Sequence, residues 1–408
     1  MMPSPWKIVK TAEGERDGVR RRVIPYGRQS LDGNDIDAVV RVLKSDWLTT
    51  GPSVEEFEKA FAAFVGAGYA VAVSNGTAAL HTAMRAVGIG PGDEAIVPPL
   101  TFAATANAVI YQGGRPVFAD IDPKTLLLDP EAAEARITSR TCALVAVDYA
   151  GQPCDYDALR AVAGRHGLKL IADACHSLGA EYKGKPAGTL ADLTVFSFHP
   201  VKHITTGEGG MITTDDPALA AVMRRFRNHG IDTDHRQRAE NGTWRYEMVD
   251  LGYNYRLSDI ACALGASQLR KLPVWLARRR KIAASYDRAF SGLEPLAIPE
   301  TSPFVRHAYH LYPIRYRSGR PGGGRGNFFR LLREQGIGAN VHYLPVHLHP
   351  YYRERYGHRR GDYPVSEGAY DELISLPIFP GMSDGDRDRV IEAVGTAIRL
   401  DARMEEET

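Results

Sequence analysis

The stretch between Tyr69 and Asp173 alternates short apolar runs with helical patterns, and this alternation restricts the possible folds more than any other feature of the chain. The apolar runs cover residues 69–74, 94–97, 116–120, 142–148 and 169–173. The helical patterns between them cover residues 78–87, 102–111, 131–137 and 156–166. Continuous apolar strands separated by helices are typical of a mainly parallel sheet covered on both faces. We therefore predict an α/β fold whose ligands gather at the carboxyl ends of the strands.

At 408 residues the chain is long enough for two domains. We predict a polar N-terminal tail at 1–23, a large α/β domain at 24–290 and a smaller α+β domain at 291–408. Further strands are expected at 194–198, 211–214 and 309–316. Further helices are expected at 32–44, 217–228, 258–269, 274–290, 328–335 and 384–400. The helix at 274–290 is entered through Pro273, which is compatible with a helix start but not with a helix interior.

Charge and cysteine content exclude several classes of protein. The 50 Lys and Arg residues balance 49 Asp and Glu residues, so nothing suggests a polyanionic partner for the whole molecule. The basic runs 20–22 and 278–281 come without a recognised nucleic-acid motif, and no nucleic acid is predicted. The four cysteines lack C-x-x-C spacing, and no apolar run has the length of a signal peptide or a membrane span. These features predict a cytoplasmic protein that does not enter a membrane.

Lys202 follows the buried-type strand 194–198 and Pro200, and it precedes a glycine-rich turn. A lysine that is crowded by apolar neighbours loses hydration in its charged form, so its pKa falls and its neutral amine can attack a carbonyl. The alternative is an exposed lysine whose stem lies along the surface, which is the usual place for this residue.

Four other features lie at predicted strand ends and can converge with Lys202. Residues 74–77, Ser-Asn-Gly-Thr, open a helix and form either an anion-binding cradle or a plain helix cap. Asp173 could cap a helix, bind a metal or hold a protonated heterocyclic nitrogen. Ser197 offers a hydroxyl, and the ring of Phe102, which opens a helix, could lie flat on a ligand. An anion cradle, an acid, a stacking ring and an amine are together the parts that bind pyridoxal phosphate.

Several motifs resemble those of the DegT-type nucleotide-sugar aminotransferases, which are pyridoxal-phosphate enzymes of fold type I. They are Ser74-Asn75-Gly76-Thr77-Ala78-Ala79-Leu80, Asp173-Ala174-Cys175-His176-Ser177, Phe196-Ser197-Phe198-His199-Pro200-Val201-Lys202 and Gly252-Tyr253-Asn254-Tyr255-Arg256. Within this family the chain is most similar to the PseC aminotransferases of the pseudaminic acid pathway. Stretches that match that group include 24–26, 48–52, 147–151, 204–210 and 341–346. The resemblance runs from about residue 24 to the C-terminus.

The resemblance implies a role for each residue of the cofactor site. Lys202 would form a Schiff base with the cofactor and act as the catalytic acid and base. The other residues implied in cofactor binding are Gly76, Thr77 and Ser197 at the phosphate, Phe102 stacked on the ring, Asp173 at the pyridine nitrogen, His176 near the ring, and Asn254 reaching the phosphate of a neighbouring subunit in a homodimer. The usual proline after the lysine motif is replaced by His203. Neighbouring side chains in an extended segment point in opposite directions, so His203 is expected to face away from the aldehyde.

The resemblance also implies the substrates. The amino group of L-glutamate would pass to the C4 keto group of UDP-2-acetamido-2,6-dideoxy-β-L-arabino-hexos-4-ulose. The residues implied in contacts with the nucleotide sugar are Tyr26, Asp46, Trp47, Leu48, Thr49, His342, Tyr343, Leu344 and Pro345. Arg256 is the candidate for the glutamate carboxylate.

Other readings of the same residues stay open. The machinery could act on another nucleotide 4-keto or 3-keto sugar, or the protein could bind the cofactor without catalysis. A dehydratase variant of the family carries histidine instead of the lysine, and Lys202 argues against it. His342, His347 and His349 could ligate zinc, but no cysteine or clear carboxylate completes that set, and no metal is predicted.

Overall fold

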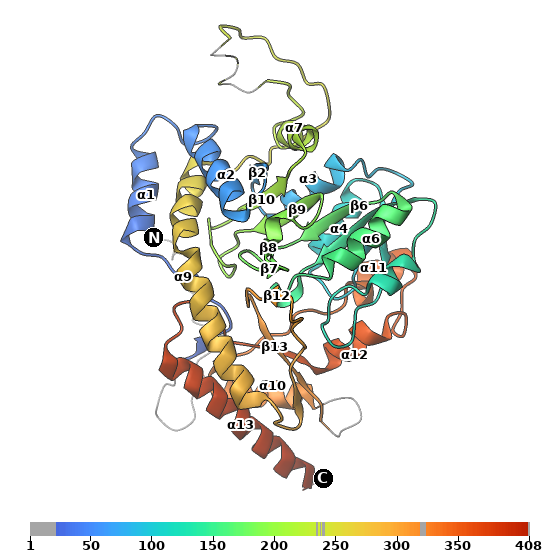
Figure 1. Cartoon of the computed structure of the whole chain (residues 1–408). Helices are drawn as coiled ribbons and strands as arrows, with labels where there is room; N and C mark the ends of the chain where they lie inside the picture. Colours follow the sequence, from blue (N-terminus) through green and yellow to red (C-terminus); the bar gives the residue numbers. More distant parts are fainter. Residues whose placement is uncertain (1–21, 234–235, 237, 239–240, 319–323, 407–408) are drawn as a thin grey trace, which may run out of the picture.

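The computed structural model describes residues 22–233, 236, 238, 241–318 and 324–406, and a seven-stranded sheet lies at its centre (Figure 1). In spatial order the strands are β2 (Tyr69–Val73), β10 (Gly210–Thr214), β9 (Leu193–Ser197), β6 (Lys169–Asp173), β5 (Thr141–Val147), β3 (Glu94–Val97) and β4 (Arg115–Phe118). Strand β10 is antiparallel to both of its neighbours, and the remaining pairs are parallel. The predicted α/β fold with a mainly parallel sheet is confirmed.

Helices cover both faces of this sheet because successive side chains of each strand point to opposite faces. In β2, for example, Ala70 and Ala72 belong to one apolar core, whereas Val71 and Val73 belong to the other. The first core includes residues of α2 (Pro52–Val65), α5 (Pro130–Glu134), α6 (Tyr156–His166) and α9 (Asp259–Phe290). The second core includes residues of α3 (Gly76–Ala86), α4 (Ala104–Tyr111) and α7 (Pro217–Phe226).

Side-chain caps begin three of these helices directly after the chain leaves the sheet or a loop. Asn75 caps α3, Asp155 caps α6 and Asp216 caps α7, each through a side-chain oxygen that accepts a backbone N–H. Such caps satisfy donors that the first helical turn leaves free. The switch from strand to helix is therefore encoded locally at these positions.

A third apolar core joins the C-terminal segments to Ile24 and to the second half of α9. It contains the sheet β11 (Leu296–Ala297), β13 (Tyr312–Tyr316) and β15 (Leu373–Leu376), with α10 (Arg325–Glu334) and α13 (Asp384–Glu406). The remaining elements are β1 (Ile24–Pro25), α1 (Gly33–Leu43), η1 (Tyr149–Gly151), β7 (Glu181–Tyr182), β8 (Lys185–Pro186), η2 (Ala187–Thr189), β12 (Val305–Arg306), β14 (Ile337–Gly338), η3 (Val346–Leu348), α11 (Pro350–Tyr356) and α12 (Pro364–Glu372). The domain boundary at residue 290 stays a prediction.

The predicted break at Pro273 is wrong, because α9 runs without interruption from Asp259 to Phe290. Proline removes one intrahelical hydrogen bond. Residues on both sides of it, including Leu272 and Leu276, are buried in the first core, and this packing holds the helix together across the missing bond. Helix α2 was not predicted, and Phe102 lies before α4 instead of opening it.

Parts of the predicted organisation fall outside the described residues. They are most of the N-terminal tail and the glycine-rich residues 319–323. Among the helices that the structure describes, none combines the length and the apolar character needed to cross a membrane.

Candidate active site

The ends of β2, β6 and β9 bring the predicted cofactor residues to one edge of the sheet. Asp173 ends β6, Ser197 ends β9, and Gly76 begins α3 three residues after the last residue of β2. The turn that carries Lys202 is closed at its base, where the backbone N–H of Phe198 donates to the carbonyl of Gly209 at 2.8 Å. The amine of Lys202 therefore lies on a turn that a backbone hydrogen bond holds at this edge of the sheet.

Lys202 is half-buried, and its Nζ lies 3.4 Å from Nε2 of His310. Burial lowers the pKa of Lys202 below its usual value, although the nearby Cys175 and Asp173 act in the opposite direction. Among the described residues, Lys202 forms no ion pair with a carboxylate. Its amine can therefore lose a proton more readily than a surface lysine.

Buried histidines surround this amine. The ring centroid of His310 lies 4.4 Å from that of His176 and 5.6 Å from that of His203. Burial lowers the pKa of His176, His203 and His310 well below the usual histidine value, so these rings are neutral. The Nδ1 atoms of all three are buried without a hydrogen-bond partner. Nε2 of His203 lies 3.2 Å from the carbonyl oxygen of Ala308.

Asp173 is buried and has hydrogen-bonding partners that carry no charge. Its Oδ2 accepts from Oγ1 of Thr105 at 2.7 Å, and its Oδ1 accepts from the backbone N–H of Cys175 at 3.3 Å. Behind it lies Asp148, whose pKa burial raises to about 7 in spite of hydrogen bonds from Ser177 and Tyr156. A protonated ring nitrogen would give the Asp173 carboxylate the cation that it otherwise lacks.

The start of α3 has the shape and the free donors of a phosphate cradle. The Asn75 side chain accepts from the N–H of Ala78, while the N–H groups of Gly76 and Thr77 have no acceptor among the residues that the structure describes. A Cβ added at Gly76 would lie 2.9 Å from Cβ of Ser197, so a side chain there would fill the space beside the Ser197 hydroxyl. Free N–H groups at a helix N-terminus bind phosphate well. The residues present therefore fit the phosphate of pyridoxal phosphate.

Aromatic side chains from separate parts of the chain form the mouth of the site. The ring of Phe102 is 60% exposed and its centroid lies 5.9 Å from that of Tyr343. The Tyr343 hydroxyl lies 3.1 Å from Nε2 of His176. The Tyr26 ring lies 5.3 Å from the His342 ring, and burial lowers the pKa of His342 to about 4. The exposed face of Phe102 is available for stacking on a ligand.

The other residues predicted to contact the nucleotide sugar lie in two separate turns. Leu344 and Pro345 continue the His342–Tyr343 turn, and the following Val346 N–H donates to the carbonyl of Pro99 at 2.8 Å. Residues 46–49 form an exposed turn after α1, which meets the start of α9 where the Asp259 N–H donates to the Leu48 carbonyl. These four residues are Asp46, Trp47, Leu48 and Thr49.

Asn254 and Arg256 lie on the segment that joins α7 to α9. Nη1 of Arg256 donates to Oδ1 of Asn228 at 2.6 Å, and Asn254 pairs with Asn228 in an isolated β-bridge. The Asn254 side chain is exposed. Its predicted contact with the phosphate of a second subunit stays a prediction.

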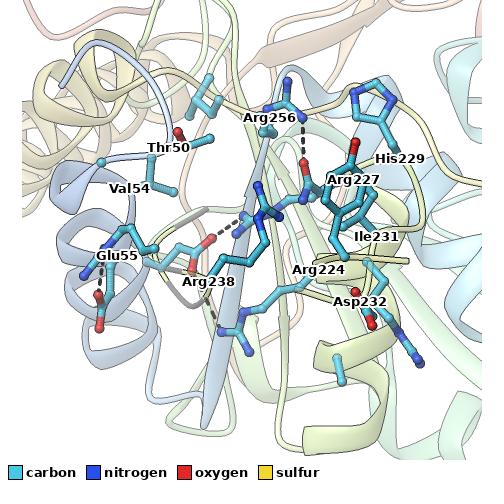
Figure 2. A pocket seen from close by; sticks show the side chains of 18 residues that line it. Thr50, Val54, Glu55, Arg224, Arg227, His229, Ile231, Asp232, Arg238 and Arg256 are labelled. Atoms are coloured by element: carbon cyan, nitrogen blue, oxygen red, sulfur yellow. Dashed lines mark hydrogen bonds and ion pairs between the residues drawn. The ribbon is translucent and has the colours of Figure 1, made fainter. Parts of the chain in front are cut away.

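An arginine-rich cavity of about 1130 Å³ lies beside this segment (Figure 2). The start of α2, the end of α7 and the segment between α7 and α9 line it. Its arginines are Arg224, Arg225, Arg227, Arg236, Arg238 and Arg256. We call this cavity the arginine pocket.

The histidines considered as zinc ligands have separate environments. Nε2 of His347 lies 2.9 Å from Oε1 of Glu367, and Nδ1 of His342 lies 2.9 Å from the Ser375 hydroxyl. In the part of the chain that the structure describes, no three candidate ligands are grouped for a metal ion.

His310 is the contact of Lys202 that was not predicted. Nη1 of Arg279 donates to the carbonyls of Tyr309, His310 and Ile378 at 3.1, 3.3 and 2.9 Å, and so fixes the backbone that carries His310. A histidine at the start of the apolar strand 309–316 was the available signal, but nothing in the sequence links it to a lysine more than a hundred residues earlier.

Comparison with known proteins agrees with this geometry. The profile of the DegT/DnrJ/EryC1/StrS aminotransferase family matches residues 29–395. Spore coat polysaccharide biosynthesis protein SpsC of Bacillus subtilis is 44% identical over 382 residues, which cover 93% of this chain and 98% of that protein.

Two solved structures are similar over nearly the whole chain. The putative sugar aminotransferase Spr1654 from Streptococcus pneumoniae, in its PMP form, is 32% identical with a TM-score of 0.88, covering 93% of this chain and 100% of that one. PseC from Helicobacter pylori, described as an aminotransferase of pseudoaminic acid biosynthesis, is 32% identical with a TM-score of 0.86, again covering 93% and 100%.

Fold and site together define an enzyme of the pyridoxal-phosphate class of fold type I. The chain belongs to the DegT/DnrJ/EryC1/StrS aminotransferase family. It is a sugar aminotransferase whose cofactor is pyridoxal phosphate, and the predicted family, enzyme class and cofactor are confirmed.

Proposed function

We propose that this enzyme transfers the amino group of L-glutamate to the C4 keto group of a UDP-4-keto-6-deoxy-N-acetylhexosamine, UDP-2-acetamido-2,6-dideoxy-β-L-arabino-hexos-4-ulose, in pseudaminic acid biosynthesis. The observation that carries the transfer chemistry is the half-buried amine of Lys202, 3.4 Å from a neutral imidazole and without a carboxylate partner. The choice of sugar is supported by the similarity to PseC, whose structure is related over 93% of this chain.

The proposed cofactor contacts follow from the site. The N–H groups of Gly76 and Thr77 and the Ser197 hydroxyl bind the phosphate, and Phe102 lies on the ring. Asp173 accepts a hydrogen bond from the ring nitrogen and keeps it protonated. When bound, pyridoxal phosphate supplies an electron sink and a carrier for the amino group.

Lys202 moves the proton in each half of the reaction. Its neutral Nζ removes the α-proton of glutamate, and in the second half it returns a proton to C4 of the sugar. This role requires an amine pKa that is closer to neutrality than that of an exposed lysine. Nε2 of His310 accepts a hydrogen bond from the amine or donates one to it. The rings of His176 and His203 are neutral, so they place no additional positive charge beside the amine.

The sugar-nucleotide contacts are assigned to both sides of the mouth. Tyr26 and the turn from His342 to Pro345 contact the sugar, and residues 46–49 contact the nucleotide sugar at the outer side. Asn254 and Arg256 act in the site of a second copy, with Asn254 at the phosphate and Arg256 at the glutamate carboxylate. The enzyme is therefore proposed to be a homodimer with shared sites, and its four free cysteines suit the cytoplasm.

A second candidate is the same transfer to another nucleotide 4-keto or 3-keto sugar. The 44% identity to SpsC, a spore coat polysaccharide biosynthesis protein, exceeds the 32% identity to PseC. The stereochemistry of the acceptor depends on the pocket face that each hydroxyl meets, so identity alone favours neither sugar.

Two measurements test the proposal. Each candidate ketosugar is incubated with the enzyme and glutamate, and release of 2-oxoglutarate is followed; fastest turnover of the L-arabino 4-keto UDP-sugar is expected. Fastest turnover of a D-configured or 3-keto sugar would replace it with the second candidate. Borohydride reduction with pyridoxal phosphate, followed by peptide mass mapping, is expected to find a pyridoxyl group on Lys202. That adduct without turnover of any ketosugar would indicate a cofactor-binding protein that does not catalyse.

A further inference from the structure

Arg279 is a charged side chain in the interior of the protein. It lies on α9 and is only 1% exposed. Burial alone lowers its pKa to about 9, and no carboxylate of the described residues forms an ion pair with it. Its Nε is also buried without a hydrogen-bond partner. Because a buried arginine without a counter-charge is costly, the hydrogen bonds that it does make require an explanation.

All of these hydrogen bonds go from one nitrogen of Arg279 to main-chain carbonyls. Nη1 donates to Tyr309, His310 and Ile378 at 3.1, 3.3 and 2.9 Å. The N–H of Ile378 in turn donates to the carbonyl of Tyr26 at 3.1 Å. A single guanidinium therefore connects the segment that carries His310 with the segment beside Tyr26, a residue at the mouth of the site.

The turn that follows β5 holds the same segment from its other side. The N–H of Ala308 donates to the carbonyl of Gly151 at 3.0 Å, and the N–H of Leu311 donates to the carbonyl of Ala150 at 3.1 Å. Gly151 has a φ of +106°, and a Cβ added to it would lie 3.0 Å from the backbone nitrogen of His310. The backbone of His310 is thus fixed between this turn and α9, with no space for it to shift toward the turn.

Fixing this backbone also fixes the imidazole beside the reacting amine, because Nε2 of His310 lies 3.4 Å from Nζ of Lys202. Burial and the surrounding cationic or basic groups lower the pKa of His310 well below its usual value. The titratable and charged groups that face His310 are Lys202, His176, His203 and Arg279, and those that face Lys202 from the cofactor side are Cys175 and Asp173. The charge of the guanidinium therefore opposes protonation of His310.

We propose that Arg279 is a positioning residue for the amino transfer, which holds Nε2 of His310 beside the amine of Lys202 and uses its charge to keep the transferred proton on the lysine. Arg279 acts through His310, since none of its hydrogen bonds reaches Lys202. The inference rests on the proposed role of Lys202 as the proton carrier. It does not depend on which ketosugar is the acceptor.

The first test compares Arg279→Lys and Arg279→Met by the pH dependence of kcat. Lysine keeps the charge but lacks the planar fork of arginine, so kcat is expected to fall by about 10-fold with an unchanged profile. Methionine removes the charge as well. His310 then takes up a proton more readily, and the fall of kcat on the acidic side should move to higher pH by about one unit. Equal losses and wild-type profiles in both variants would assign Arg279 to structure alone.

Arg280→Lys is the matched control. Arg280 is the next residue of α9, and it also donates to main-chain carbonyls, those of His307 and Gly179 at 2.9 and 3.0 Å. Its variant loses the same kind of bond without touching residue 310, so kcat within about twofold of wild type and an unchanged pH profile are expected. Circular dichroism checks the folding of each variant. An Arg279→Lys protein that does not fold would overturn the proposal, because the residue would then serve stability.

The second test asks whether the effect of Arg279 passes through His310. His310→Gln, Arg279→Lys and the double variant form a cycle in which kcat is measured. If Arg279 acts through the imidazole, the double variant should lose no more activity than His310→Gln alone. Additive losses would contradict this route and overturn the proposal.

The third test needs neither cofactor nor substrate. Hydrogen–deuterium exchange at the C2 position of each histidine, read by mass spectrometry of the full-length protein across a pH series, reports when each imidazole titrates. The pKa of His310 is expected to be higher in Arg279→Met than in wild type or Arg279→Lys. His347, a buried histidine that pairs with Glu367, is the internal control and should not change. An unchanged His310 in Arg279→Met would overturn the electrostatic part of the proposal.

These readouts separate the inference from the proposed function. The expected change of His310 in Arg279→Met, together with no turnover of any ketosugar, would contradict the proposed function and retain the influence of Arg279 on His310. Turnover of the ketosugar with additive losses and an unchanged His310 would contradict the inference and retain the function.

Discussion

The lysine site and the arginine pocket treat cationic side chains in opposite ways. Around Lys202, burial lowers the pKa of the amine and of His176 and His310, so the charged form of each of these groups is disfavoured. In the arginine pocket, the side chains of Arg224 and Arg225 are exposed, and the carboxylates of Glu55, Glu58 and Asp232 line the same cavity. Positive charge is therefore disfavoured by burial around the reacting amine of Lys202, and it is exposed to solvent at Arg224 and Arg225.

The largest test of this contrast is Lys202→Ala. We expect turnover to fall by roughly 10⁴-fold, because the nucleophile and the proton carrier are lost together. Affinity for UDP should change less than about twofold. Steady-state assays and calorimetry measure the two quantities, and Lys169→Ala, an exposed lysine at the start of β6, is the control. If the affinity for UDP fell as much as turnover did, the lysine site and the arginine pocket would have to be parts of one site.

His310→Gln tests whether the neutral imidazole beside the amine contributes to the reaction. We expect kcat to fall by about 10- to 100-fold while KM for the nucleotide sugar is preserved, because His310 contacts the amine and not the arginine pocket. His349→Gln, at the start of α11, should leave both constants unchanged. A rise in KM with constant kcat would show that His310 belongs to substrate binding.

Ionic strength should separate the regions without any substitution. Raising salt from about 0.05 M to about 0.5 M shortens the screening length, so KM for the nucleotide sugar is expected to rise several-fold. The kcat should change little, because the buried groups around Lys202 are screened less. The Arg224→Gln/Arg225→Gln variant should show a weaker salt dependence of KM. If KM depended on salt equally in the variant and in the wild type, the arginine pocket would have no electrostatic role in binding the nucleotide sugar.

Asp148→Asn probes desolvation behind the lysine site and should have the smallest effect. Burial raises the pKa of Asp148 from 3.8 to about 7, so the unfolded state ionises first as pH rises. The unfolding free energy of the wild type therefore falls between about pH 4 and pH 7. The variant lacks this decrease, and its Tm should gain about 2–4 °C relative to wild type between these pH values. Thermal unfolding across that range checks it, and identical pH curves would contradict a buried acid.

Residues that lie in local motifs were predicted from the sequence and brought to one sheet edge by the fold. Gly76, Asp173, Ser197 and Lys202 each lie at or just after a strand end, and strand ends can be recognised from apolar runs. His310 and Arg279 could not be predicted in this way. Their roles depend on contacts between segments far apart in the chain, which only tertiary packing defines.

Two helices were predicted incorrectly, one in spite of a clear sequence pattern and one because tertiary packing overrides a local rule. Helix α2 carries Phe57, Phe61 and Val65 at helical spacing behind Pro52, so its signal was present in the sequence. The division of α9 at Pro273 followed a sound local rule, and burial on both sides of the proline overrides that rule. Local propensity is a weak guide where a long helix crosses more than one core.

The uninterrupted helix α9 fixes the distance between the arginine pocket and the lysine site. In its first turn, the Asp259 carboxylate accepts hydrogen bonds from the backbone N–H groups of Gly51 and Ser53 at 2.8 and 2.9 Å, beside the arginine pocket. Further along the helix, Arg279 donates a hydrogen bond to the carbonyl of His310. Arg279 follows Asp259 by twenty residues, a separation of about 30 Å at the rise of an α-helix. Inserting one residue between them would turn one end by about 100° against the other, so the spacing of these two anchor points is as much a part of the enzyme as either anchor.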